Sequence, residues 1–174
     1  MNNHIRTYSR YYYNTFVNNF KYALILLNRQ HFDVFKAIDS ILGSQEYKDI
    51  VDRKNYKILG LTSQQIVEIA DKKSCEKDEA YKAIDIDKYA SSLYGDIDII
   101  TADDYVDKES VKEDALLWLG ELLVYFQWKY GIDMQEWLKH FNSKEIYDMY
   151  PIMSKVFVYN AACKLYYLYK QRAQ

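Results

Sequence analysis

Proline and glycine are scarce in this chain, with 1 proline and 5 glycines in 174 residues. Both residues destabilise helix interiors, proline by removing a hydrogen bond and glycine through its conformational entropy. Their scarcity therefore favours helices. The chain is 49% hydrophobic, which is enough for a sizeable core, and its length suits one domain. We predict an all-α, single-domain bundle over residues 1–174 with about six to eight helices.

The spacing of apolar side chains and of capping residues gives the helix positions. A half-buried helix repeats apolar residues every three to four positions, and Ser, Thr or Asp often precedes it while Gly follows it. These patterns predict helices over 3–28, 32–42, 45–53, 77–94, 111–130, 134–141 and 152–171, another capped by Thr62, and a short one from Ser143. Ser110 is the expected cap of 111–130. We expect 111–130 and 152–171 to be central, and 97–100 to be a short strand or an extended loop.

Charge is unevenly distributed along the chain, although the net charge is only −2. Residues 1–36 carry five basic side chains and one acidic one, a sum of +4. Residues 96–114 carry eight acidic side chains and two basic ones, a sum of −6, and we predict an acidic loop over 96–109. Such asymmetry indicates an electrostatic partner surface, or two ends of the chain that attract each other.

Targeting and redox features favour the cytoplasm. The 2 cysteines, Cys75 and Cys163, are far apart, which is typical of a reducing compartment. The N-terminus lacks the apolar run of a secretory signal. No apolar stretch approaches the length of a membrane span. We therefore predict a cytoplasmic protein that does not associate with a membrane.

The sequence does not support an enzyme, a metal site or a cofactor site. None of the 3 histidines lies at metal-ligand spacing from another. The acidic run from Asp96 to Asp107 resembles a calcium loop, but Thr101 occupies the position that needs glycine. No phosphate-binding or nucleophile motif occurs. Cys75, between lysines, is either a surface thiol or a reactive one. We expect no catalytic residue, no metal and no cofactor.

Aromatic residues indicate a protein partner. The chain has 19 tyrosines, and all 3 tryptophans lie between residues 118 and 137. Tyr and Trp are favoured at interfaces because they bury large areas at little entropic cost. We predict a non-catalytic interaction module that binds and neutralises a partner protein, with a second copy of the chain as an alternative partner. Its predicted binding residues are four aromatic anchors and three acidic side chains that would mimic phosphates: Trp128, Trp137, Tyr147, Tyr150, Asp103, Asp104 and Asp107.

The alternative hypothesis is nucleic-acid binding through the N-terminal helix. Basic side chains there are interleaved with tyrosines, a combination suited to phosphate contact and base stacking. The residues concerned are Arg6, Arg10, Tyr11, Tyr12 and Lys21. The nearly neutral net charge of the whole chain makes nucleic acid the less favoured partner.

The segments ALLWLGELLVYFQWKYGIDMQEW and NSKEIYDMYP resemble part of a known group of proteins. They are similar to small helical antitoxin-like proteins encoded beside toxin genes in AT-rich Gram-positive bacteria. The resemblance covers about a third of the chain, and this chain departs from it at Val124 and Phe126 and in having no histidine after His140. It implies a neutraliser of a toxin or of a nucleic-acid-binding enzyme, in a bacterium or its phage. The matching residues are Trp118, Leu119, Gly120, Tyr125, Trp128, Gly131, Ser143, Lys144, Glu145, Ile146 and Tyr147.

Overall fold

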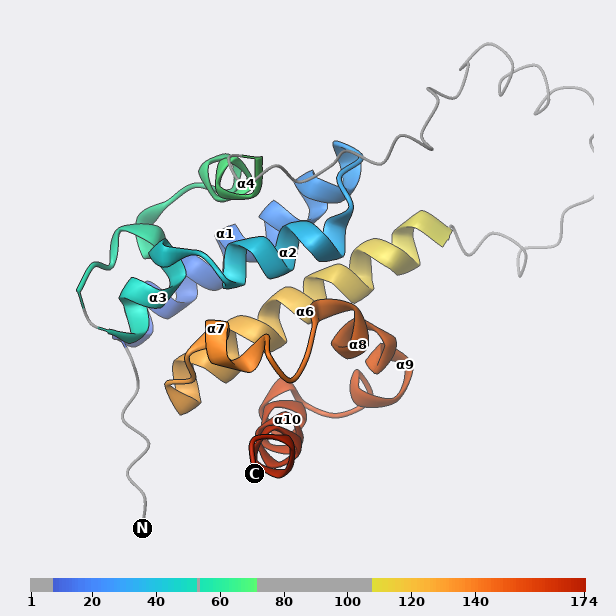
Figure 1. Cartoon of the computed structure of the whole chain (residues 1–174). Helices are drawn as coiled ribbons and strands as arrows, with labels where there is room; N and C mark the ends of the chain where they lie inside the picture. The colour runs from blue at the N-terminus through green and yellow to red at the C-terminus, as the bar shows by residue number, and fades with distance from the viewer. Residues whose placement is uncertain (1–7, 53, 72–107) are drawn as a thin grey trace, which may run out of the picture.

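The computed structural model describes residues 8–52, 54–71 and 108–174. In these residues the protein consists of helices and short connections, without a strand, and the helices pack in one body (Figure 1). The all-α prediction is confirmed. The elements are α1 (Arg10–Arg29), α2 (Val34–Leu42), α3 (Gln45–Val51), the 3-10 helix η1 (Lys57–Gly60), α4 (Ser63–Asp71), α6 (Lys108–Tyr130), α7 (Met134–Trp137), α8 (Ser143–Asp148), α9 (Tyr150–Met153) and α10 (Val158–Arg172).

The two longest helices, α1 and α6, form the centre of the body (Figure 1). They run antiparallel, because Trp128 near the end of α6 contacts Tyr8 just before α1, while Arg29 at the end of α1 pairs with Glu113 near the start of α6. On the far side of α1 lies α4, and on the far side of α6 lies α10. The packing order is therefore α4, α1, α6, α10, which puts α4 and α10 on opposite sides of the molecule.

Close packing of α1 against α6 depends on Gly120. A Cβ atom added there would lie 3.3 Å from the Cα of Lys21 and 3.3 Å from a methyl group of Leu24. Real Cβ atoms rarely approach neighbours this closely. The absence of a side chain at Gly120 thus sets the distance between the two central helices.

Several predicted helix ends are confirmed. Thr62 and Gln65 form a reciprocal cap before α4, in which each backbone N–H donates to the other residue's side chain, at 3.0 and 3.3 Å. The side chain of Asp133 accepts from the backbone of α7. Gly131 ends α6 with a φ of 62°, a left-handed conformation that favours glycine.

Other predicted boundaries are wrong. Ser110 lies inside α6, which begins at Lys108, so it is not the cap. The helix expected over 134–141 ends at Trp137. The short helix expected from Ser143 is α8, which ends before Pro151, and Pro151 itself lies in the first turn of α9, where its missing N–H costs nothing. The predictions for 3–7, 77–94 and 97–100, and most of the acidic loop, lie outside the described residues.

The final helix differs most from its prediction. The expected helix over 152–171 is divided into α9 and α10, with a non-helical turn between them. Nor is α10 central, because its main contact is with α6 and its fully buried residues are Ala161, Ala162 and Leu165. Apolar residues on several faces indicate a helix that is either surrounded or in contact with a partner. In the structure one face of α10 is covered and another faces solvent.

Candidate functional site

Two of the four predicted aromatic anchors belong to the core. Trp128 is only 5% exposed, its indole Nε1–H donates to the Tyr8 carbonyl at 2.8 Å, and its ring stacks on Tyr13 at 4.5 Å. Trp137 is fully buried and stacks on Phe141 at 5.5 Å. A partner docked on this arrangement cannot contact either indole, so we exclude both from the candidate surface.

The other two predicted anchors, Tyr147 and Tyr150, are half-buried. The ring of Tyr147 meets Phe35 edge-on at 5.0 Å, and that of Tyr150 meets Trp118 edge-on at 5.4 Å. These contacts hold both rings against the core and leave each residue partly accessible. The remaining predicted partner-binding residues, Asp103, Asp104 and Asp107, lie outside the described residues.

The predicted nucleic-acid residues separate into two groups along α1. Arg10, Tyr11 and Tyr12 are exposed at its start; Tyr11 is 77% exposed and meets Tyr12 edge-on at 5.6 Å. Lys21 lies about 15 Å further along the helix, and its ammonium pairs with Glu121 at 3.2 Å. The structure therefore brings together the first three residues but not Lys21, whose charge is offset. Arg6 is outside the described residues.

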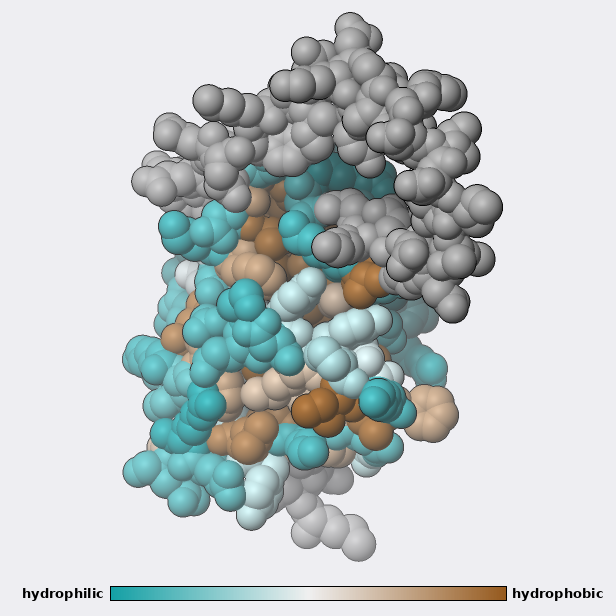
Figure 2. Space-filling model, turned by 90° about the vertical axis from the view of Figure 1, so that its right-hand side faces the viewer, coloured by the Kyte–Doolittle hydropathy of each residue, from teal (hydrophilic) through white to brown (hydrophobic). Residues whose placement is uncertain are grey.

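An exposed apolar surface lies on α9, α10 and the turn between them. Phe157 is 84% exposed and Ile152 is 73% exposed, although both are large apolar side chains. We call the set of five exposed apolar and aromatic residues here the α9–α10 surface: Ile152, Val156, Phe157, Tyr159 and Tyr167. Figure 2 shows brown apolar groups among hydrophilic ones on the side of the molecule that carries α8 and α9. Ile152 and Phe157 were missed because a continuous helix over 152–171 gave no reason to place them outside.

The α9–α10 surface lies in a basic part of the chain. Residues 150–174 contain no Asp or Glu and four basic side chains, those of Lys155, Lys164, Lys170 and Arg172. Lys155 and Lys164 are exposed. Arg172 instead packs against the rest of the body, where it donates to the His140 carbonyl at 2.7 Å. The surface therefore combines exposed rings with accessible positive charge.

Contacts between tyrosines and a lysine attach α10 to α6. The ammonium of Lys129 lies 3.7 Å from the ring centre of Tyr159, a cation–π contact. The ring of Tyr130 stacks on Tyr166 at 4.2 Å, and its hydroxyl donates to the Cys163 sulfur at 3.0 Å. Burial, followed by this hydrogen bond, raises the pKa of Tyr130, so the phenol stays protonated at neutral pH. These contacts hold one face of α10 against α6, and Tyr159, which is 50% exposed, belongs both to this contact and to the α9–α10 surface.

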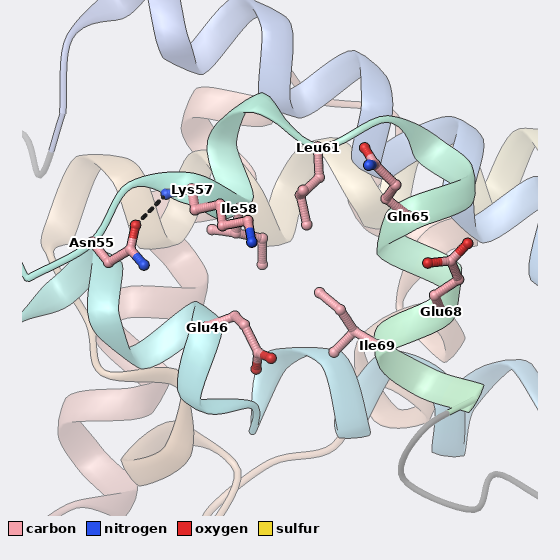
Figure 3. A pocket seen from close by; sticks show the side chains of 8 residues that line it. All are labelled: Glu46, Asn55, Lys57, Ile58, Leu61, Gln65, Glu68 and Ile69. Carbon is pink, nitrogen blue, oxygen red and sulfur yellow. Dashed lines mark hydrogen bonds between the residues drawn. The ribbon is translucent and has the colours of Figure 1, made fainter.

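A cleft of about 200 Å³ lies on the opposite side of the molecule, between α3, η1 and α4 (Figure 3). Its apolar wall comes from Ile58, Leu61 and Ile69, and its charged groups are Glu46, Lys57 and Glu68; Asn55 and Gln65 complete it. Pockets for drug-sized ligands span about 300–1,000 Å³. The cleft is thus sized for a single side chain.

Neither a metal site nor a membrane-spanning helix is found in the part of the chain that the structure describes. There, no three His, Cys, Asp or Glu side chains lie together as a metal site requires. None of its helices combines the length and the apolar character needed to cross a membrane. The candidate sites are therefore the α9–α10 surface, the start of α1 and the cleft.

Comparison with protein-family models, curated proteins and solved structures found no match to this chain. Several residues that carry the resemblance to antitoxin-like proteins, including Trp118, Leu119, Trp128 and Ile146, are buried. Their pattern is accounted for by packing, so it does not identify a binding site. Function must therefore be argued from the surfaces.

Proposed function

We propose that this protein is a non-catalytic module that binds and neutralises a partner protein, and that the α9–α10 surface makes the contact. The observation that carries the proposal is the exposure of Phe157 and Ile152, at 84% and 73%. Large apolar side chains that are left in water favour association, because contact removes their area from water.

The size of the surface suits a protein partner. If a fully exposed side chain of this kind presents about 200 Å², the five residues together offer about 600 Å². A typical stable interface buries about 800 Å² on each partner. A partner that contacted all five residues would therefore find in them most of one side of such an interface, and neighbouring polar groups would supply its rim.

Charge narrows the chemistry of the partner. The exposed lysines Lys155 and Lys164, in a stretch of the chain without Asp or Glu, favour a partner whose apolar patch is flanked by acidic groups. Two copies of the chain that met through this surface would bring like charges together, which disfavours a homodimer here. We place the activity in the cytoplasm, in line with only two widely separated cysteines.

The test is capture of partners by three tagged versions of the full chain. These are the wild type, the double variant Ile152→Ser with Phe157→Ser, and the control Tyr22→Ser, which removes an exposed ring from α1 instead. We expect a stoichiometric protein with the wild type and the control, and its loss with the double variant. Mass spectrometry identifies the protein, and circular dichroism checks that each variant folds. Retention by the double variant, or equal loss in the control, would contradict the proposal.

A second candidate function rests on the exposed cluster at the start of α1. Arg10 can contact a phosphate while Tyr11 and Tyr12 stack on bases. This candidate predicts binding of single-stranded oligonucleotides with an affinity that falls steeply with salt. Fluorescence anisotropy with the double variant Tyr11→Ser and Tyr12→Ser tests it. Affinity that is unchanged in that variant would exclude the cluster as the binding site.

A further inference from the structure

The geometry points to a second docking site, in which the cleft between α3, η1 and α4 accepts one lysine or arginine side chain of a basic partner protein. This inference does not depend on the proposed function, because the cleft and the α9–α10 surface lie on opposite sides of the molecule. The two sites also differ in charge, so they would select different chemistry.

Two carboxylates at the cleft are available for a cation. Eight ion pairs join acidic and basic side chains within the described residues, and neither Glu46 nor Glu68 takes part in any of them. Both glutamates are exposed and line the same cleft, Glu46 from α3 and Glu68 from α4 (Figure 3). With Lys57 as the third charged group, the cleft carries a net charge of −1.

The apolar wall explains why a side chain fits better than a small ion. Ile58 and Ile69 are buried residues whose side chains face the cleft, and Leu61 closes it from above in the view of Figure 3. Lysine and arginine carry long aliphatic stems that cover apolar surface while the charged end remains hydrated. A stem against these three residues would place its cation beside the carboxylates.

The position of the wall is fixed by local hydrogen bonds. The side chain of Asn55 accepts from the backbone N–H of Lys57 at 2.8 Å, which starts the η1 turn. The reciprocal cap of Thr62 and Gln65 then starts α4. Local hydrogen bonds therefore hold both segments that form the apolar wall of the cleft.

The experiment is a titration of the ¹⁵N-labelled full chain with N-acetyl-lysine methylamide, followed by amide chemical shifts. The matched neutral probe is N-acetyl-norleucine methylamide, which keeps the aliphatic stem and lacks the charge. We expect saturable shifts at the amides of 45–47, 58–61 and 65–69 with the lysine probe, and weaker binding of the norleucine probe, which keeps the stem but lacks the charge. Higher salt should weaken the binding, since exposed charges are screened.

Substitutions at the cleft should act in opposite directions. Exposed ion pairs contribute little each, so Glu46→Gln or Glu68→Gln should weaken binding about two- to five-fold. Lys57→Met should strengthen it by about the same factor, because the competing cation is lost. Asp114→Asn, at an exposed acid on α6, is the control and should leave binding unchanged. A purely structural role of these side chains would not give opposite signs.

Several results would overturn the inference. Equal binding of the norleucine probe, or weaker lysine binding by Lys57→Met, would show that charge does not select the ligand. Shifts with spermidine but not with the peptide-like lysine probe would assign the cleft to a free polyamine. Shifts at the same amides when the protein alone is concentrated would show that a second copy occupies the cleft.

Discussion

Replacing Trp128 by phenylalanine should destabilise the fold far more than the same replacement at Trp118. Both tryptophans lie on α6, and they are 5% and 8% exposed. The indole N–H of Trp128 donates to the buried Tyr8 carbonyl at 2.8 Å. The indole N–H of Trp118 has no acceptor among the described residues. The two substitutions therefore lose similar ring area and differ mainly in one hydrogen bond.

The size of the expected difference in stability follows from the Tyr8 carbonyl, which loses its hydrogen-bond donor when Trp128 is replaced. A buried polar group without its partner costs about 1–3 kcal/mol, so Trp128→Phe should lower the free energy of unfolding by that amount more than Trp118→Phe. Denaturation in urea, followed by circular dichroism, measures the difference. With a slope of about 2 kcal/mol per M, the two midpoints should differ by about 0.5–1.5 M.

The slopes of the two unfolding curves serve as the internal check, since equal slopes show that both variants expose the same surface on unfolding. Equal midpoints, or a lower midpoint for Trp118→Phe, would refute the argument that the hydrogen bond decides the difference. Unfolding of Trp128→Phe that matched the wild type, together with loss of partner binding, would restore Trp128 as a surface anchor.

Three further substitutions, and a matched control at Gly60, test other parts of the structure by urea unfolding. Gly120→Val should lower the free energy of unfolding by about 1–3 kcal/mol, because the new side chain would meet α1. At Gly60 an added Cβ has no neighbouring atom within 4 Å, so Gly60→Ala should change the free energy of unfolding by less than about 1 kcal/mol. Thr62→Ala should cost about 1 kcal/mol, because α4 loses its cap; an unchanged midpoint would show that the cap is dispensable. Burial raises the pKa of Asp39 above its ordinary 3.8, so the folded state holds a proton more tightly than the unfolded chain. The contribution of Asp39 to stability should therefore fall as pH rises from 3.8 through its folded pKa. The stability of Asp39→Asn, compared with that of the wild type at the same pH, should be higher at pH 7 than at pH 4; the reverse order would contradict the burial argument.

The sequence predicted α2, α3 and α4 well, because their signals are local. Gly43 follows α2, and Thr62 precedes α4 and forms a reciprocal cap with Gln65 in its first turn, as expected. The candidate sites were predicted less well. The acids that line the cleft come from two helices, and nothing in their spacing, Glu46 to Glu68, indicates that they share a cleft.

The sequence by itself determined that the chain is helical, since few glycines and prolines and a three-to-four apolar spacing leave little else. Only the tertiary structure decided which aromatic rings are buried. Trp128 is held by a carbonyl 120 positions away, while Phe157 faces solvent beside a helix that is covered on one face. The spacing of apolar residues predicts that a helix has an apolar face. Which element covers that face depends on packing between segments that are distant in the sequence. For this reason the surface left for a partner could be found only after the helices were assembled.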